Sequence, residues 1–393
     1  MEVVASNVTL DADHPIVRLQ RNALIAGVAG LVLTAVGFFL SPDQFFRSYL
    51  LGFMYWFGIA LGSMAILMIH HIAGGAWGAV IRRVLESSIG TIPLLAVLFV
   101  PIALGTDHLY EWAHADVVAK DPVLQAKSAY LNVPFFLVRA VFYFVVWSLV
   151  ASLLRRWSLE QDRDGDPKVT LRMELMSRGG LVLYGLTVTF AVIDWVMSLQ
   201  PHWYSTIYGL LVMAGQGLAA FAFAIPLGVM LSRRESVSRV FGAAQFHDLG
   251  NLMLAFTMIW AYLSFSQLII IWSGNLPEET SWYLLRSAGG WKIVGYGLLL
   301  LHFAVPFAVL LSRKLKRTGT KLAVVALWML VMRFVDLYWL VAPSFHPANA
   351  LPHWLDFTAV IGIGGIWLWF FVGILSKGPV LAIKDPSLPE VEA

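Results

Sequence analysis

The sequence predicts an all-α, polytopic membrane protein with ten transmembrane helices. Of its 393 residues, 59% are hydrophobic and only 13% are charged, whereas soluble domains carry about 25% charged residues. The mean hydropathy of +0.74 agrees with this composition. The apolar residues also gather in stretches of about 20, the length that crosses a bilayer as a helix. Ten such stretches leave no room for a soluble domain.

Windows of about 20 residues place the predicted helices in chain order. They cover residues 22–40, 49–70, 89–105, 134–154, 179–199, 203–231, 247–271, 291–311, 321–341 and 356–375. The residues before the first helix lack the basic and apolar regions of a cleavable signal. We therefore expect the chain to begin with its own first transmembrane helix.

One pattern occurs twice and predicts how the helices are grouped. Asp194 and Asp336 each lie inside an apolar run, and each is followed seven residues later by a proline, Pro201 or Pro343. A carboxylate at hydrocarbon depth costs several kcal/mol unless it is paired, protonated or hydrated. The two helices are four spans apart and run in the same direction. This favours two four-helix bundles related by a pseudo-two-fold axis along the membrane normal.

The repeat divides the chain into six predicted segments. These are a cytoplasmic N-terminal segment (1–21), a first peripheral helix (22–48), a first bundle of helices two to five (49–199), a second bundle of helices six to nine (200–341), an outer loop with the tenth helix (342–375) and a cytoplasmic tail (376–393).

Basic residues predict the orientation. Of the 27 Lys and Arg residues, 20 lie on the two terminal segments and alternate loops, 5 lie on the opposite loops, and Arg139 and Arg333 lie inside helices. By the positive-inside rule both termini face the cytoplasm. The protein would then be a multi-pass protein of a bacterial inner membrane. The basic pI of about 9.0 has the same origin, so it gives no reason to expect nucleic acid as a partner.

With this orientation, ionisable residues gather near the outer face. Asp194 is five residues from the helix end at Leu199, so it lies about 8 Å below the outer surface, and Arg139 has a similar depth. We expect an outer proton half-channel. Its candidate residues are Asp194, Arg139, His202, Arg333, Asp336 and Asp356. The sharpest hypothesis is that Asp194 carries protons or controls water there.

A second group of ionisable residues lies toward the cytoplasmic face. His302 reaches from that side toward the middle of the membrane, and the others sit near helix ends. We expect these residues to form a cytoplasmic half-channel. The candidates are His70, His71, Glu86, His247, Asp248 and His302.

Each of these patterns also has a simpler structural interpretation. Arg333 with Asp336, and Arg139 with Asp194, would then be ion pairs that only hold helices together. His70 and His71 would be interfacial residues at a helix end. Tyrosine and hydroxyl side chains near Asp194 would still form a stripe able to hold water. Most tryptophans would form an aromatic belt at the membrane surface; these include Trp112, Trp203, Trp272, Trp282, Trp291 and Trp354.

The chain contains no cysteine. This excludes iron–sulfur ligation, covalent c-type haem attachment and disulfides in this chain. A b-type haem would need facing intramembrane histidines, and His302 alone lies deep in a span. We therefore expect no metal and no redox centre in this chain, and any electron chemistry must be housed elsewhere.

Two segments resemble a known family. One is the run from Ile193 to Gly209, IDWVMSLQPHWYSTIYG, and the other contains His70-His71, Gly74-Gly75-Ala76-Trp77-Gly78 and Arg82-Arg83. Together they are similar to a membrane subunit of alternative complex III, a bacterial quinol:cytochrome c oxidoreductase. The resemblance spans essentially the whole chain. It implies the fold of the polysulfide-reductase-type membrane subunits, with two four-helix bundles and peripheral helices.

The resemblance also implies partners and cofactors. Haem c and iron–sulfur clusters would lie on partner subunits, namely c-type cytochromes and an iron–sulfur protein, and a sister membrane subunit of the same fold would carry the quinol site. This chain would be a non-catalytic subunit that provides a proton pathway and a scaffold among membrane lipids. In the alternative within the family, it binds quinone at its own outer-face site. The residues of such a site are unknown from sequence.

A different class remains open, a secondary transporter with inverted repeats and broken helices around a midplane site. Against it, the repeat is parallel and no helix pair is interrupted at matching positions. Within the family interpretation, the loops from Thr106 to Val133 and from Ser273 to Gly290 are long enough to dock extrinsic redox subunits.

Overall fold

The computed structural model describes residues 10, 14–233 and 235–388, and it confirms a polytopic helical membrane protein. Helices make up 81% of the structure. Within the described residues, ten helical segments are long and apolar enough to cross a membrane. They are α2 (Pro15–Leu40), α3 (Pro42–Ala73), α5 to α7 (Arg82–Ile89, Ile92–Leu98, Val100–Leu104), α11 (Val133–Asp164), α12 (Pro167–Trp195) with η2 (Met197–Leu199), α13 (Tyr208–Leu231), α15 (Ala243–Gly274), α17, η3 and α18 (Trp291–Gly297, Leu298–Ala304, Val305–Leu310), α20 (Gly319–Val341) with η4 (Ala342–Ser344) and α21 (Trp354–Leu375).

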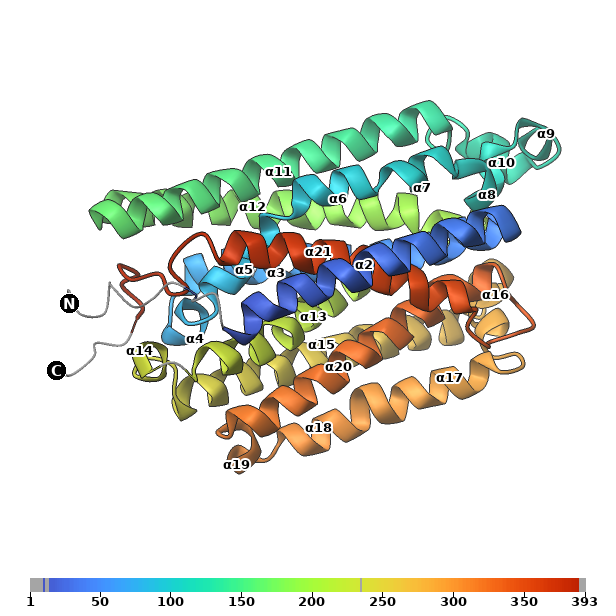
Figure 1. Ribbon diagram of the computed structural model, residues 1–393. Helices are drawn as coiled ribbons and strands as arrows, with labels where there is room; N and C mark the ends of the chain where they lie inside the picture. Colours follow the sequence, from blue (N-terminus) through green and yellow to red (C-terminus); the bar gives the residue numbers. More distant parts are fainter. Residues whose placement is uncertain (1–9, 11–13, 234, 389–393) are drawn as a thin grey trace.

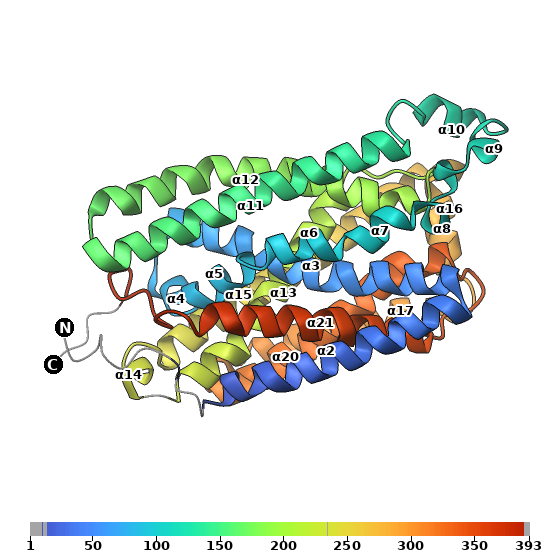
Figure 2. The same cartoon turned by 45° about the horizontal axis from the view of Figure 1, so that its top comes forward.

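Short helices fill the connections. They are α4 (Ala76–Ala79), α8 (Thr106–Leu109), η1 (Glu111–Ala113), α9 (Ala115–Val118), α10 (Pro122–Lys127), α14 (Glu235–Ser238), α16 (Pro277–Arg286) and α19 (Arg313–Lys316). We call the end that carries α8 to α10 and α16 the loop end, and the opposite end, where residues 376–388 lie, the tail end (Figures 1 and 2). The beginning of α2 also lies at the tail end.

All ten predicted spans are present, but several are longer than their apolar cores. The largest extension is in the hairpin of α11 and α12. Both helices continue beyond their apolar residues and are joined by a short turn that contains Gly165. That glycine has a φ of 67°, a left-handed value that ends α11. Similarly, α3 ends at Gly74, whose φ is 66°.

The third span departs from the predicted continuous helix 89–105. It begins earlier, at Arg82, and consists of three short helices. Pro93 and Pro101 lie in the first turns of the second and third pieces. Because proline has no N–H to donate, each piece starts a new hydrogen-bonding run.

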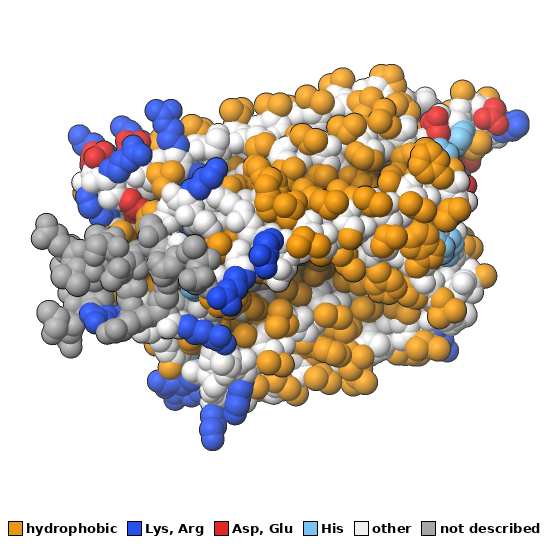
Figure 3. Space-filling model, viewed as in Figure 1, with side chains coloured by type: hydrophobic (Ala, Val, Ile, Leu, Met, Phe, Trp, Pro, Cys, Tyr) orange, Lys and Arg blue, Asp and Glu red, His pale blue; other side chains and the backbone are white. Residues whose placement is uncertain are grey.

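Two central helices, α3 and α13, pack against each other and join the two predicted bundles. One group consists of α3 with α5, α6 and α12, which pack on it, and α11, which packs on α12. The other consists of α13 with α15 and α20, which pack on it, and η3 and α18, which pack on α15. We call the first group the first bundle and the second group the second bundle. A broad apolar surface covers the middle of the molecule, and Lys and Arg gather near the tail end (Figure 3).

The first and last helices form a separate tight pair. α2 packs chiefly on α21, and α21 in turn packs on α3. The contact is close because glycines face each other: a Cβ on Gly27 would lie 2.6 Å from the backbone N of Ile366, and a Cβ on Gly30 would lie 2.6 Å from that of Gly362. Only glycine allows this backbone approach.

Candidate functional site

The first bundle contains a closed ion pair. Arg139 of α11 donates from Nε to Oδ2 of Asp194 at 2.8 Å and from Nη2 to Oδ1 at 2.9 Å. Tyr143 also donates its hydroxyl to Oδ2 at 2.9 Å. Asp194 is fully buried. Arg139 and Asp194 therefore lie at the same level of the bundle, as predicted. Both carboxylate oxygens of Asp194 accept hydrogen bonds from protein groups.

Aromatic side chains enclose this pair. The Arg139 guanidinium lies 3.8 Å from the ring centre of Tyr130 and 4.4 Å from that of Phe135. Next to Asp194 in the chain, Trp195 packs against Phe99, with ring centres 4.7 Å apart, and against Phe57, with ring centres 5.1 Å apart. Such packing leaves little space for water beside Asp194.

The hydroxyl stripe expected beside Asp194 is satisfied by protein groups. Tyr184 donates to Gln216, Thr187 accepts from the indole of Trp147, and Ser198 donates to the backbone oxygen of Asp194. These contacts favour the structural interpretation of Asp194.

The second bundle holds its acid differently. Arg333 donates from Nη1 to Oδ2 of Asp336 at 2.6 Å, and both residues belong to α20. Arg333 Nε has no hydrogen-bond partner among the described residues. The pair therefore connects two turns of one helix, whereas the Arg139–Asp194 pair joins two helices.

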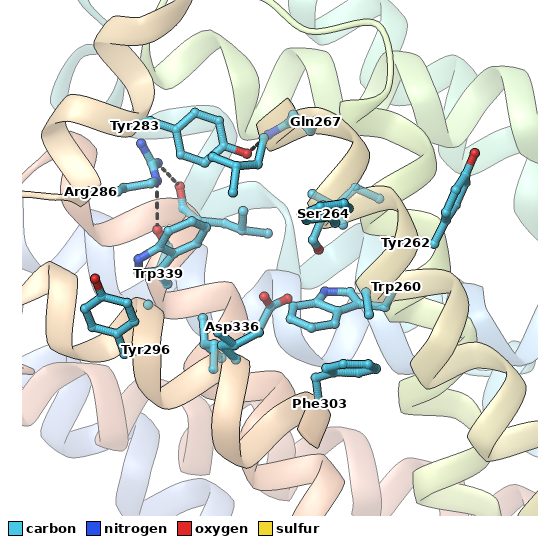
Figure 4. A pocket seen from close by; sticks show the side chains of 18 of the residues that line it. Trp260, Tyr262, Ser264, Gln267, Tyr283, Arg286, Tyr296, Phe303, Asp336 and Trp339 are labelled. Carbon is cyan, nitrogen blue, oxygen red and sulfur yellow. Dashed lines mark hydrogen bonds between the residues drawn. The ribbon is translucent and has the colours of Figure 1, made fainter. Parts of the chain in front are cut away.

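Asp336 lies at the wall of a cavity of about 640 Å³ in the loop-end half of the second bundle (Figure 4). The cavity lies between α15, α16, α17, η3 and α20. Its lining is mainly apolar and aromatic, and includes Trp260, Phe265, Trp282, Leu299, Phe303 and Trp339. Asp336 is thus a carboxylate facing a space large enough for a small molecule.

Polar groups line the other end of the cavity. Gln267 accepts from Ser205 at 3.0 Å, and its Nε2 lies 3.4 Å from the Tyr283 hydroxyl. Arg286 donates to the backbone oxygens of Trp339, Leu340 and Trp282. Burial lowers the pKa of the Arg286 guanidinium to about 9. It is therefore still charged at neutral pH.

Two buried polar side chains next to the cavity lack partners. Neither ring nitrogen of His302 has a hydrogen-bond partner within the described chain, although the side chain is fully buried. Its ring centre lies 4.1 Å from that of Trp260. The indole Nε1 of Trp260 lies near Asp336 without completing a hydrogen bond of normal geometry. Unpaired groups of this kind cost several kcal/mol in a membrane unless water or a ligand satisfies them.

His302 lies in the π-helical turn η3, which precedes Pro306. Proline cannot donate to the preceding turn, and the backbone oxygen of Leu301 accepts from the indole of Trp328 at 2.9 Å instead. π-helical turns occur frequently at functional sites. The sequence correctly predicted that His302 lies deep in a span, but gave no indication of this turn.

The tail end of the first bundle contains a dense polar network around Arg82. Its guanidinium donates to Glu86 at 2.8 Å, Gln161 at 2.8 Å and Asp385 at 2.7 Å. His70 contacts Asp385 at 3.3 Å. Burial alone would raise the pKa of the Asp385 carboxyl, but the hydrogen bond with His70 and the charge of Arg82 outweigh it and hold the pKa well below its usual range.

The structure divides each set of predicted pathway residues into separate groups. On the predicted outer side, His202 contacts Asp121 at 2.5 Å on the surface, and Asp356 accepts from Ser48 at 2.5 Å and from the backbone N–H of His353. Neither contact involves Asp194 or Asp336.

The predicted cytoplasmic residues are divided in the same way. His70 and Glu86 share the Arg82 network, and His71 contacts Ser177 at 3.1 Å. His247 lies instead beside Asp248 on α15, and His302 lies in the second bundle.

Several important residues were missed from the sequence. Asp385 lies in a polar tail without a pattern, Arg286 lies in the polar segment predicted only as a docking loop, and Gln267 is a single uncharged polar residue within an apolar run. The Arg82–Glu86 pair had a usable signal, because residues four apart on a helix face each other. Four of the six tryptophans assigned to an aromatic belt have side chains that pack inside the protein: Trp112, Trp203, Trp282 and Trp291.

Among the described residues, no group of three or more His, Asp or Glu side chains is placed to hold a metal ion. Comparison with protein-family models gives no match to the chain, and comparison with curated proteins gives none either. The fold and these sites therefore define a class, a polytopic helical membrane protein with one closed and one cavity-facing acidic site.

Proposed function

We propose that the protein is an integral membrane subunit of a quinol-oxidising complex of the alternative complex III type, and that its second bundle carries protons near the outer face. The observation that carries the proton role is the position of Asp336 at a cavity, beside unpaired nitrogens of Trp260 and His302. The membership in such a complex rests on the resemblance of the segment Ile193 to Gly209 and on the absence of cysteine.

The proton role belongs to Asp336 rather than Asp194 for a geometric reason. A group that exchanges protons must be reached by a donor or acceptor within about 3 Å or through one water. Arg139 and Tyr143 already occupy the oxygens of Asp194. Asp336 is bound on one oxygen by Arg333 and faces open space.

The basic residues near the tail end support the proposed orientation, with both termini in the cytoplasm and the loop end outside. The helices α8 to α10 project from the loop end (Figure 2). They would dock the extrinsic redox subunits, together with α16. Crosslinking from Asp116 and Glu278 should then identify iron–sulfur or cytochrome subunits, whereas crosslinks confined to the α11–α12 hairpin would contradict this arrangement.

The test compares two neutralised acids in the assembled complex reconstituted into vesicles. Asp336→Asn should retain the subunits and much of the quinol oxidation, while proton release per electron falls by roughly ten-fold or more. The matched control is Asp194→Asn combined with Arg139→Gln, which removes the first pair without leaving a buried charge. This control should keep its coupling.

Three results would count against the proposal. Full coupling in Asp336→Asn would remove the proton role from the second bundle. Loss of coupling in the Asp194→Asn, Arg139→Gln variant, with assembly intact, would return that role to the first bundle. Purification of the chain without any redox subunit would contradict membership in such a complex.

A further inference from the structure

We infer that the cavity of the second bundle binds an anionic phospholipid from the loop-end leaflet, with the phosphate at Arg286 and Lys292 and one acyl chain along the helices. This inference goes beyond the proposed function, because it concerns a lipid held beside Asp336 and not the movement of protons. Binding can be measured on the purified full chain without any partner subunit.

Arg286 is a buried cation without a counter-ion. Only 2% of the residue is exposed, and its guanidinium donates to the backbone oxygens of Trp282, Trp339 and Leu340. None of the described carboxylates forms an ion pair with it, although the Trp282 ring gives a cation–π contact at 3.6 Å. A buried charge is costly unless an opposite charge accompanies it. Of the five guanidinium N–H groups, those not used by the backbone oxygens remain available to an anion.

A second cation and two hydroxyl groups lie at the same end of the cavity. Lys292 lines the cavity near the start of α17, where its Nζ lies 5.9 Å from the ring centre of Tyr296. It forms no ion pair within the described part of the chain. Because Gln267 contacts Tyr283 through its amide nitrogen, the Tyr283 hydroxyl keeps its own hydrogen to donate. The hydroxyl of Ser287 also lines this end. Phosphate oxygens can accept from all of these groups.

The charges of the cavity favour an anion. The charged side chains that line it are Arg286, Lys292 and Asp336. The Asp336 charge is balanced by Arg333, from which it accepts at 2.6 Å. The two remaining cations therefore leave the cavity positive, so it attracts a phosphate diester.

The cavity opens toward the lipid. Tyr262 and Phe265 of α15 and Tyr296 and Leu299 of the α17–η3 segment line it, yet between 60% and 69% of each residue is exposed. Both segments belong to apolar membrane spans. The Asp336 side of the cavity is buried. A lipid can therefore enter sideways from the bilayer, whereas a soluble anion would have to cross apolar surface.

The depth of the cavity matches one leaflet of a bilayer. On one span the lining residues extend from Lys292 at the loop end to Phe303, and on the facing helix they extend from Leu268 to Met258. Figure 4 shows Phe303 at the end of the cavity away from Arg286. At helical rise the distance from Lys292 to Phe303 is about 16 Å, close to half of the hydrocarbon thickness of about 30 Å. The space therefore suits an acyl chain whose headgroup lies at the loop end.

The first test is photolabelling of the full chain in phosphatidylcholine vesicles that contain phosphatidylglycerol with a diazirine on one acyl chain. Label should appear on residues 258–268 and 292–303. Unlabelled phosphatidylglycerol at ten times its Kd should reduce this label by roughly ten-fold. Sodium phosphate should not reduce it. A phosphatidylcholine probe with the same diazirine should label these peptides several-fold less.

Three results of this first test would overturn the inference. Label confined to other helices would show that the cavity takes up no acyl chain. Equal labelling by the phosphatidylcholine probe would show that the headgroup charge is not recognised. Loss of the label in sodium phosphate would assign the two cations to a soluble anion instead of a lipid.

Two exposed lysines at the loop end give a matched pair of variants for the headgroup. Lys292 lines the cavity, whereas Lys120, between α9 and α10, does not. Lys292→Gln should reduce phosphatidylglycerol labelling by roughly five-fold, the effect of one basic residue on an anionic lipid. Lys120→Gln should label like the wild type. Equal labelling of the two variants would contradict binding of the phosphate at Lys292.

Two glycines of α17 give a matched pair for the acyl chain. Gly295 lines the cavity, and a Cβ there would lie 3.5 Å from Trp339, whereas a Cβ on Gly297 meets nothing within 4 Å. Gly295→Phe should fill the space and reduce labelling by roughly ten-fold, while Gly297→Phe should label like the wild type. Equal labelling of these two variants would overturn the placement of the chain. If Gly295→Phe fails to fold, the lysine pair still decides, and none of these measurements depends on proton release.

Discussion

The two bundles each keep one aspartate in the loop-end half beside an arginine, yet they use the pair in different ways. In the first bundle Arg139 reaches from α11 to α12 and binds both oxygens of Asp194. In the second bundle Arg333 binds one oxygen of Asp336 from the preceding turn of the same helix. The same pair of residue types therefore joins two helices in the first bundle. In the second bundle it leaves the Asp336 carboxylate at the wall of a cavity.

The surroundings explain this difference. Large aromatic rings fill the interior next to Asp194, where Trp195 and Phe144 stack with ring centres 5.7 Å apart. In the second bundle, α15 and the α17–α18 segment have few buried side chains, and the space between them near the loop end is the cavity. A buried charge pair is stable in the first setting, whereas the second setting admits a ligand or water.

The largest expected effect is on the stability of the first bundle. Arg139→Gln alone should lower the free energy of unfolding by about 3 to 5 kcal/mol, because it leaves Asp194 as an uncompensated buried charge. Adding Asp194→Asn should recover most of that loss. Thermal unfolding of the detergent-purified protein measures both. A single variant as stable as the wild type would show that the pair does not lock the bundle.

An intermediate effect on stability is expected at the tail end. There Arg82 forms a buried polar network, as Arg139 and Asp194 form a buried pair in the first bundle, but the network also includes Asp385 of the tail. Asp385→Asn should cost about 2 kcal/mol, the value of a hydrogen bond to a charged group, and should make residues 376–388 easier to cleave by protease. The matched control is Ser387→Ala, which leaves the carboxylate in place and should be cleaved like the wild type.

The same carboxylate predicts a pH dependence. The pKa of Asp385 is lower in the folded protein than in the unfolded chain, so its stabilising contribution is complete above the unfolded value of about 3.9. It is lost as the pH falls from there through the folded pKa. Protease cleavage of the tail at pH 7 and pH 3 should differ in the wild type and not in Asp385→Asn. A wild-type tail that is equally protected at both pH values would contradict this linkage.

The smallest effect is expected at Asp336. Asp336→Asn should lower the free energy of unfolding by about 1.5 kcal/mol, the lower end of the range for a hydrogen bond to a charged group, because it weakens one contact between adjacent turns of a single helix. The same unfolding assay measures it. A loss as large as that of Arg139→Gln would show that both bundles use their aspartate as a lock.

The sequence predicted the fold well, since all ten spans are present. Their length and apolar composition follow directly from bilayer thickness. It also predicted that Asp194 and Arg139 lie at one depth, because depth depends only on helical rise. The approach of the two side chains depends on how α11 and α12 are rotated, which no local pattern fixes.

The cavity could not be predicted in the same way. It arises where α15 and α17 do not fill the space between them, and the residues at its wall, such as Gln267 and Arg286, are spread over several helices. Asp385 was missed because its partner His70 is 315 positions away. Long-range contacts of single polar residues leave no periodic signal in the sequence.

The tight pairing of α2 with α21 has a consequence for biosynthesis. α2 is synthesised long before α21, on which it chiefly packs, and the glycine contact between Gly27 and the backbone near Ile366 cannot form until both helices are in the membrane. At about 5 to 20 residues per second, α2 waits roughly 15 to 60 seconds for α21. During that time α2 must be shielded by lipid or by the insertion machinery, and a chain that lacks α21 would leave α2 without its main neighbour.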